Sequence, residues 1–261
     1  MPCGLTTKFA CGQRARNGEC IVENDQVKRV LALGNNVGGL VLGGKRDAKD
    51  VANCLQVIND HPDFVDRLRL GSTADTSKIR EELILWQKFD QKFFPDVNVG
   101  NYTSLRIPLN PPAAFTLPIV NARGISADML VTRMRKEFKV WVNICDLDSV
   151  SSDRSPASSS YIVLVRDRIE ADDELVNESA DMLAEKAISG ITLPERLRLE
   201  FFYWWKTGQH LDLVNMTLAS GSRHYGVVPR VCYNSRAKEL ILSSCTSNVR
   251  RGNIRSRAII F

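Results

Sequence analysis

The chain has 261 residues, of which 44% are hydrophobic and 25% are charged, and its formal net charge at pH 7 is +5. This length is enough for a hydrophobic core that needs neither disulfides nor metal ions. The composition excludes collagen-like, fully disordered and disulfide-dense proteins. The N-terminal residues lack the basic start and apolar stretch of a secretion signal, and no apolar run reaches about 18 residues. We therefore expect a cytoplasmic protein without a membrane span.

The seven cysteines lie far apart in the sequence and include no CxxC pair. Structural zinc sites usually contain such close pairs, because two ligands from one tight turn preorganise the ion. We therefore predict neither a metal site nor a resident cofactor, and free thiols fit a reducing compartment.

Up to residue 148 the pattern predicts a mixed region of helices and strands. Asp47 is a candidate N-cap for a first helix, and an apolar stripe predicts a helix over residues 78–94, which Pro95 ends. Repeated prolines in residues 98–120 favour an extended edge strand and loops. Ser126 is expected to cap a helix that reaches residue 138, and residues 139–145 read as a buried strand.

Residues 149–160 contain seven serines and one proline, which is typical of a linker or a long loop. This segment divides the chain into an N-terminal region of unknown type, residues 1–148, and a C-terminal module, residues 161–261. The predicted class is α+β, with a mixed N-terminal half and with C-terminal helices that precede a small, mainly antiparallel sheet.

The C-terminal module has the clearest pattern of elements. Residues 161–165 read as a strand, and residues 171–186 as an acidic helix. Thr192 and Glu195 have the spacing of a capping box, and Gly208 is the expected C-cap of the helix that follows. Short strands are then predicted at residues 214–219, 227–233, 239–243 and 257–260.

The positive charge is concentrated at the C-terminal end. Residues 221–261 hold eight basic residues and one acidic residue, so this end carries +7 and the remaining 220 residues carry −2. Such asymmetry permits a nucleic-acid partner, although a solvated basic surface has the same composition. The predicted phosphate contacts are Arg223, Arg250, Arg251, Arg255 and Arg257, with Tyr225 or Tyr233 as stacking residues.

A structural or assembly role is the alternative of equal weight. The helix after Thr192 is apolar over much of its surface, and its end carries Phe201, Trp204 and Trp205. Exposed aromatic residues are enriched in protein interfaces. These three side chains are therefore the predicted interface with a protein partner or with a second copy of the chain.

Asp146 and Asp148 directly follow the strand predicted at residues 139–145. This arrangement is similar to the first motif of the haloacid-dehalogenase-like phosphatases, although Ser149 departs from that motif. The resemblance implies that Asp146 is a phosphoryl acceptor, that Asp148 is a general acid and base, and that magnesium bridges them. The other interpretation is a turn in which an aspartate hydrogen-bonds its own backbone.

Two further motifs match their patterns incompletely. Residues 39–46 nearly form a phosphate-binding loop, but Arg46 replaces the hydroxyl residue that would hold magnesium. His210 and Asp212 with Ser220 or Ser222 suggest hydrolase chemistry, yet no G-x-S-x-G motif is present.

An ordered series of short motifs in the last hundred residues resembles a group of uncharacterised bacterial proteins. The series comprises residues 166–172, 190–193, 195–197, 207–212, 217–218, 221–223, 228–229 and 255–257. The resemblance implies no activity. The favoured interpretation is a non-catalytic binding or assembly protein, and magnesium-dependent phosphoryl transfer at Asp146 and Asp148 is the enzymatic alternative.

Overall fold

The computed structural model describes residues 47–49, 51, 75–109 and 111–261. The chain divides into two compact units, Met1–Arg69 and Leu70–Phe261, and nearly all described residues belong to the second. That unit contains helices and strands with a mixed sheet, which fits the predicted α+β class. Of the helix predicted after Asp47 only the start is described, where Asp47 Oδ1 accepts from the Lys49 amide at 2.7 Å. The near-match to a phosphate-binding loop lies outside the described residues.

Helix α4 (Thr76–Phe93) is the helix predicted over residues 78–94. Asp75 caps it, because its side chain accepts a hydrogen bond from the Ser77 amide at 2.9 Å. The apolar residues of the predicted stripe are buried, whereas Gln91, which the prediction includes with them, is exposed. The Trp86 ring stacks on Phe202 of a later helix with a centroid separation of 3.9 Å.

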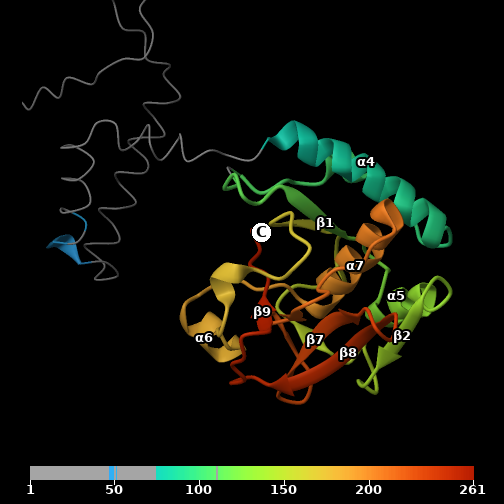
Figure 1. Ribbon diagram of the computed structural model, residues 1–261. Coiled ribbons are helices and arrows are strands. Elements are labelled where there is room, and N and C mark those ends of the chain that lie inside the picture. The colour runs from blue at the N-terminus through green and yellow to red at the C-terminus, as the bar shows by residue number, and fades with distance from the viewer. Residues whose placement is uncertain (1–46, 50, 52–74, 110) are drawn as a thin grey trace, which may run out of the picture. The chain divides into compact units, whose positions relative to one another are not determined.

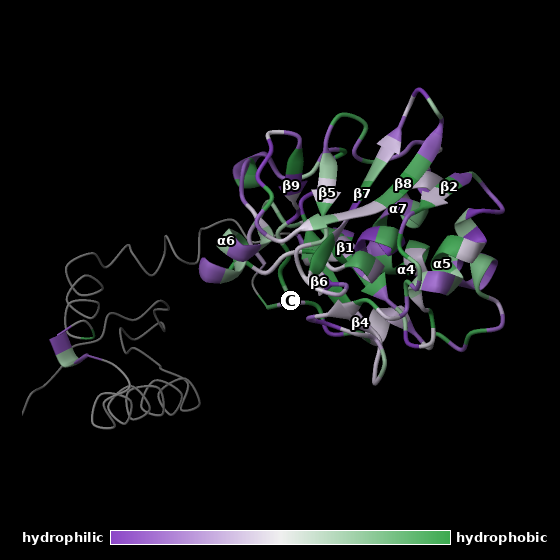
Figure 2. Ribbon diagram, turned by 90° about the horizontal axis from the view of Figure 1, so that it is seen from below, coloured by the Kyte–Doolittle hydropathy of each residue, from purple (hydrophilic) through white to green (hydrophobic). Residues whose placement is uncertain are grey.

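The main sheet has five strands in the order β2-β8-β7-β5-β9 (Figures 1 and 2). The two central pairings are antiparallel and the two outer pairings are parallel. The sheet is therefore mixed rather than mainly antiparallel. The strands are β2 (Lys139–Val142), β5 (Met216–Leu218), β7 (Val227–Asn234), β8 (Glu239–Thr246) and β9 (Ile254–Ser256).

The serine-rich segment is a loop inside one unit and does not separate two domains. Strand β1 (Leu117–Asn121) precedes it, β4 (Tyr161–Val165) follows it, and the two pair antiparallel. Within the segment, β3 (Ser151–Ser152) pairs with β6 (Ser222–Arg223). The predicted modules 1–148 and 161–261 are thus not separate units, because strand pairing joins the residues on both sides of the loop.

Two predicted elements differ from the structure. The acidic helix expected over residues 171–186 is replaced by a short 3-10 turn, η2 (Asp173–Leu175), and by α6 (Ala180–Glu185). Asn177 between them has φ of 60°, which a right-handed helix cannot contain. The strand expected at residues 257–260 begins earlier, as β9, and residues 257–260 contribute only isolated bridges to Leu164 and Gly190.

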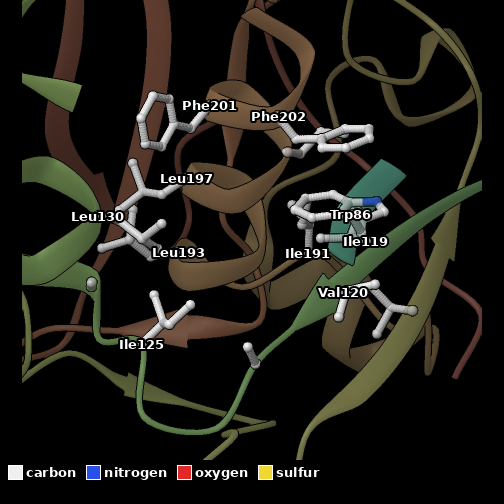
Figure 3. Packing of buried hydrophobic residues seen from close by; sticks show 14 of the residues in the cluster. Trp86, Ile119, Val120, Ile125, Leu130, Ile191, Leu193, Leu197, Phe201 and Phe202 are labelled. Atoms are coloured by element: carbon white, nitrogen blue, oxygen red, sulfur yellow. The ribbon is translucent and has the colours of Figure 1, made fainter. Parts of the chain in front are cut away.

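Helix α7 (Leu193–Thr207) runs through the middle of the unit and organises its core. The predicted capping box is confirmed, because Thr192 and Glu195 each accept the other's amide hydrogen bond. Gly208 ends the helix with φ of 70°, as expected for a C-cap glycine. Figure 3 shows that α7 packs on two sides, with Leu197 near Leu130 of α5 (Ala127–Met134) and Phe202 near Trp86 of α4.

Four charged residues of α7 are fully buried: Glu195, Arg196, Arg198 and Glu200. Each of these charged side chains pairs with an opposite charge inside the protein, because burying an unpaired charge is costly. Arg198 donates to both carboxylate oxygens of Asp90 on α4, at 2.5 and 2.7 Å, and to the carbonyl of Val120 on β1 at 2.7 Å. These pairs fix how α4, α7 and β1 pack together.

Hydrophilic and hydrophobic residues are interspersed along the ribbon of the second unit (Figure 2). Among the described residues, no helix combines the length and apolar character needed to cross a membrane.

Candidate nucleic-acid interface

One face of the five-stranded sheet is open on its β2 side. Trp141 of β2, Ile241 of β8 and Cys232 of β7 lie in one row across three strands. Their neighbours along each strand, among them Val140 and Leu240, are buried in the core, so this row points to the opposite face. The Trp141 side chain is 45% exposed, and Ile241 and Cys232 are half-buried. The strand predicted to be buried is therefore covered on one face only.

The same face is covered at the β9 side of the sheet. There Ala180 of α6 packs with Leu218, Val228 and Ile254 in a small second cluster, and α6 lies beside β9 in Figure 1. In the described part of the chain, this cover does not include Trp141 or Ile241. An aromatic side chain is thus left exposed on the edge strand of the sheet.

Basic side chains surround the exposed row. Lys139 lies two residues before Trp141 and therefore on the same face, and Arg230 has the same relation to Cys232. Exposed Arg236 and Lys238 follow in the β7–β8 turn, where the Asn234 side chain accepts the amides of Arg236 and Ala237 at 3.0 Å each.

These basic groups are only lightly compensated. Lys139 forms an ion pair of 3.4 Å with Glu239 but remains 66% exposed, and Arg230 Nε donates to Ser243 Oγ at 2.9 Å. Glu239 is the one acidic residue of strands β2, β7 and β8 and the turn between β7 and β8. The face with Trp141, Ile241, Cys232, Lys139, Arg230, Arg236 and Lys238 is called the open sheet face below.

The C-terminal arginines predicted to contact phosphate do not form such a surface. The prediction that Arg257 contacts phosphate is wrong, because this side chain is 1% exposed and donates to Asp212 Oδ1 at 2.7 Å. Arg255 pairs with Asp173, Arg250 Nε donates to the Asn177 carbonyl at 3.0 Å, and Arg223 donates to two backbone carbonyls. Arg251 is exposed.

An acidic segment packs beside the C-terminal arginines and supplies the partner of Arg255. Residues 170–185 contain seven acidic residues and no basic ones. They pack along the basic end of the chain, where Ser247 also donates to Asp181 at 2.9 Å. Arg255 and Arg257 of this end are therefore paired with carboxylates, whereas Arg250 and Arg251 are exposed.

The two predicted stacking residues differ in their surroundings. Tyr225 is 91% exposed in the two-residue turn between β6 and β7, with φ of 49°. Tyr233 instead stacks on the His210 ring at 3.7 Å, and burial followed by the nearby Glu200 carboxylate raises its pKa. Tyr225 alone remains available to a partner.

The Asp146 side chain accepts hydrogen bonds from the backbone of the residues that follow it. Its Oδ1 accepts the amides of Asp148 and Ser149 at 3.0 and 3.2 Å, which confirms the turn interpretation. Asp148 Oδ1 in turn accepts the Asp128 amide at the start of α5, at 3.1 Å. Among the described residues no group of three or more histidine, cysteine or carboxylate side chains is arranged to hold a metal ion.

The predicted aromatic interface on α7 is largely internal. Phe201 is completely buried, and its ring centroid lies 4.5 Å from that of Phe93. The prediction that Phe201 belongs to a surface interface is therefore wrong. Trp204 and Trp205 are half-buried and pack against the core. A role of these two residues in assembly stays a prediction.

Several residues of the C-terminal motif series meet in one buried ion network. Arg196 donates to Asp212 at 2.8 Å and to Glu200 at 2.8 Å, and His210 lies 2.8 Å from Glu200. Burial alone would raise the pKa of Asp212, but the charges of Arg257 and Arg196 hold it below its ordinary value. His210 therefore contacts Glu200 and not Asp212, and a hydrolytic triad is not assembled.

Comparisons with known families, curated proteins and solved structures found no match to this chain. The resemblance of the last hundred residues to a bacterial group stays a prediction.

Proposed function

We propose that the protein is a non-catalytic binding protein that holds single-stranded nucleic acid on the open sheet face. The observation that carries the proposal is the exposed indole of Trp141 on a sheet surface flanked by four basic residues. Unstacked bases pack on aromatic rings, and nearby cationic groups neutralise the phosphates.

The sheet carries a side chain for base stacking and basic groups for phosphate contact. Trp141 offers a stacking surface, with Ile241 beside it as an apolar neighbour. Lys139 and Arg230 lie at the two sides of this row, and the β7–β8 turn carries the other two basic groups. A single strand is favoured over a duplex, because a duplex keeps its bases stacked and unavailable to an indole ring.

The test is fluorescence anisotropy of the full chain with short labelled single-stranded RNA and DNA at low and moderate salt. Binding should weaken with salt, as expected for phosphate contacts. Trp141→Ala should weaken binding about tenfold, the range expected for the loss of one base stack, and Trp141→Phe should retain most of it. Circular dichroism checks that each variant is folded.

Matched variants separate this surface from the C-terminal end. Replacing Arg236 and Lys238 by glutamine should reduce the slope of log K against log salt by about 1.4, because two contacts to a single strand are lost. Replacing Arg250 and Arg251 by glutamine should leave the slope unchanged. The opposite pattern would place the interface at the C-terminal end, and no binding at low salt would reject a nucleic-acid partner.

A further inference from the structure

A second candidate site is lined by residues that do not belong to the open sheet face. A pocket of about 600 Å³ is bordered by the start of α5, the serine-rich loop and Pro194 of α7. This volume is in the range of small-molecule sites. Its walls are mainly apolar and include Ile125, Leu147, Val150 and Pro156.

Arg154 is the cationic side chain of this pocket, and hydrogen bonds to Glu195 and Gly190 hold it in place. Its Nε and Nη2 donate to the two oxygens of Glu195 at 2.9 and 3.0 Å, and Nη2 also donates to the Gly190 carbonyl at 2.7 Å. Glu195 is fully buried and accepts two more hydrogen bonds, from the Tyr161 hydroxyl at 3.0 Å and the Thr192 amide at 2.8 Å. The Arg154 side chain is 11% exposed, so little freedom remains to it.

The third nitrogen of this guanidinium is unused. Within the described residues, Nη1 of Arg154 donates to no protein atom. Arg196 in the same unit shows how such a group is completed: its Nε and Nη2 bind the Asp212 carboxylate, and its Nη1 binds a second carboxylate, Glu200, at 2.8 Å. Arg154 repeats the first half of this arrangement with Glu195, and its side chain lines the pocket.

The other lining residues limit which ligand the pocket can hold. Asp148 also lines the pocket, but its Oδ1 is already engaged by the Asp128 amide at 3.1 Å. Its negative charge disfavours an anion at that wall and leaves the Arg154 side as the place for one. Four serines also line the pocket, and the other walls offer apolar contact, so the ligand needs a carbon body as well as a charged end.

We propose that this pocket binds a small organic carboxylate with an apolar body, whose carboxylate accepts hydrogen bonds from Nη1 of Arg154. A planar carboxylate matches the guanidinium edge, and carboxylates already occupy the equivalent position at Arg196.

The experiment is an NMR titration of the full chain with phenylacetate, hexanoate and acetate, and with phenylacetamide as the uncharged control. Phenylacetate and hexanoate should shift the resonances of Arg154, Val150 and Ile125. Acetate, which lacks the apolar body, and phenylacetamide, which lacks the charge, should bind at least about tenfold more weakly, the factor for roughly 1.4 kcal/mol.

Two variants make the result specific to the pocket. Ala157→Phe adds a large side chain to the pocket lining and should abolish the shifts, whereas Ala237→Phe, in the exposed β7–β8 turn, should not. Arg154→Lys keeps a cation beside Glu195 but removes Nη1, and it should weaken phenylacetate binding at least about tenfold.

The proposal is overturned if neither phenylacetate nor hexanoate shifts the pocket resonances. It is equally overturned if phenylacetamide binds as well as phenylacetate, or if Ala157→Phe leaves binding unchanged. Nucleic-acid binding at Trp141 is independent of all these outcomes.

Discussion

The buried pair between Arg198 and Asp90 should dominate the attachment of α4 to α7. In Asp90→Ala, Arg198 loses both of its charge-assisted hydrogen bonds and keeps only the one to the Val120 carbonyl. Tyr102, whose hydroxyl donates to Asp90, also loses its partner. An uncompensated charge would then lie in a site that is about 1% exposed. We expect the free energy of unfolding to fall by about 3–5 kcal/mol.

The chain provides a matched exposed pair between the same two helices. Lys206 Nζ of α7 lies 2.5 Å from Glu82 of α4, with side chains 37% and 22% exposed. Because solvent screens such a pair, Lys206→Ala should cost at most about 1 kcal/mol. Replacing both Asp90 and Arg198 by leucine and methionine should cost less than Asp90→Ala alone, because no charge is left unpaired.

Urea unfolding followed by tryptophan fluorescence measures these differences, since all four tryptophans belong to the unit Leu70–Phe261. The reasoning is refuted if Asp90→Ala costs no more than Lys206→Ala. It is also refuted if the double variant is less stable than Asp90→Ala.

Two further predictions concern single side chains and glycines. The hydrogen bond from Arg168 lowers the pKa of Glu174 to about 2 from an ordinary 4.5, so its stabilising effect is present above pH 4.5 and is lost as the pH falls through about 2. An NMR titration should show this midpoint, and Arg168→Gln should return it toward 4.5; a wild-type midpoint near 4.5 would contradict the pairing. Gly190→Ala should destabilise by about 1–3 kcal/mol, because its methyl group would lie 1.7 Å from Ser220 Oγ. Gly252→Ala, with open space around it, should have a thermal midpoint equal to that of the wild type.

Local signals predicted the elements that local chemistry determines. The capping box at Thr192, the cap at Ser126 and the strand at residues 161–165 all lie where the sequence placed them. The acidic helix was predicted wrongly because its apolar spacing does not reveal the left-handed Asn177. The pairing of β1 with β4 is a tertiary contact, so a serine-rich loop between them had the appearance of a linker.

The site depended on information that composition does not contain. The charge pattern pointed to the C-terminal arginines, but Arg255 and Arg257 pair with Asp173 and Asp212, which are distant in sequence and adjacent in space. A usable signal for the open sheet face was present in residues 139–143, where Lys139, Trp141 and Asn143 alternate with valines. This period of two places the tryptophan on the polar face of the strand.

The most direct test of the open sheet face is the NMR signal of the Trp141 indole N–H during titration with single-stranded RNA. Stacking of a base should shift this signal progressively, in step with the anisotropy. Trp86 is an internal control, because its indole is buried and donates to the Pro118 carbonyl at 2.8 Å. A Trp141 signal that stays fixed while the RNA binds, or that moves no more than the Trp86 signal, would contradict the proposed interface.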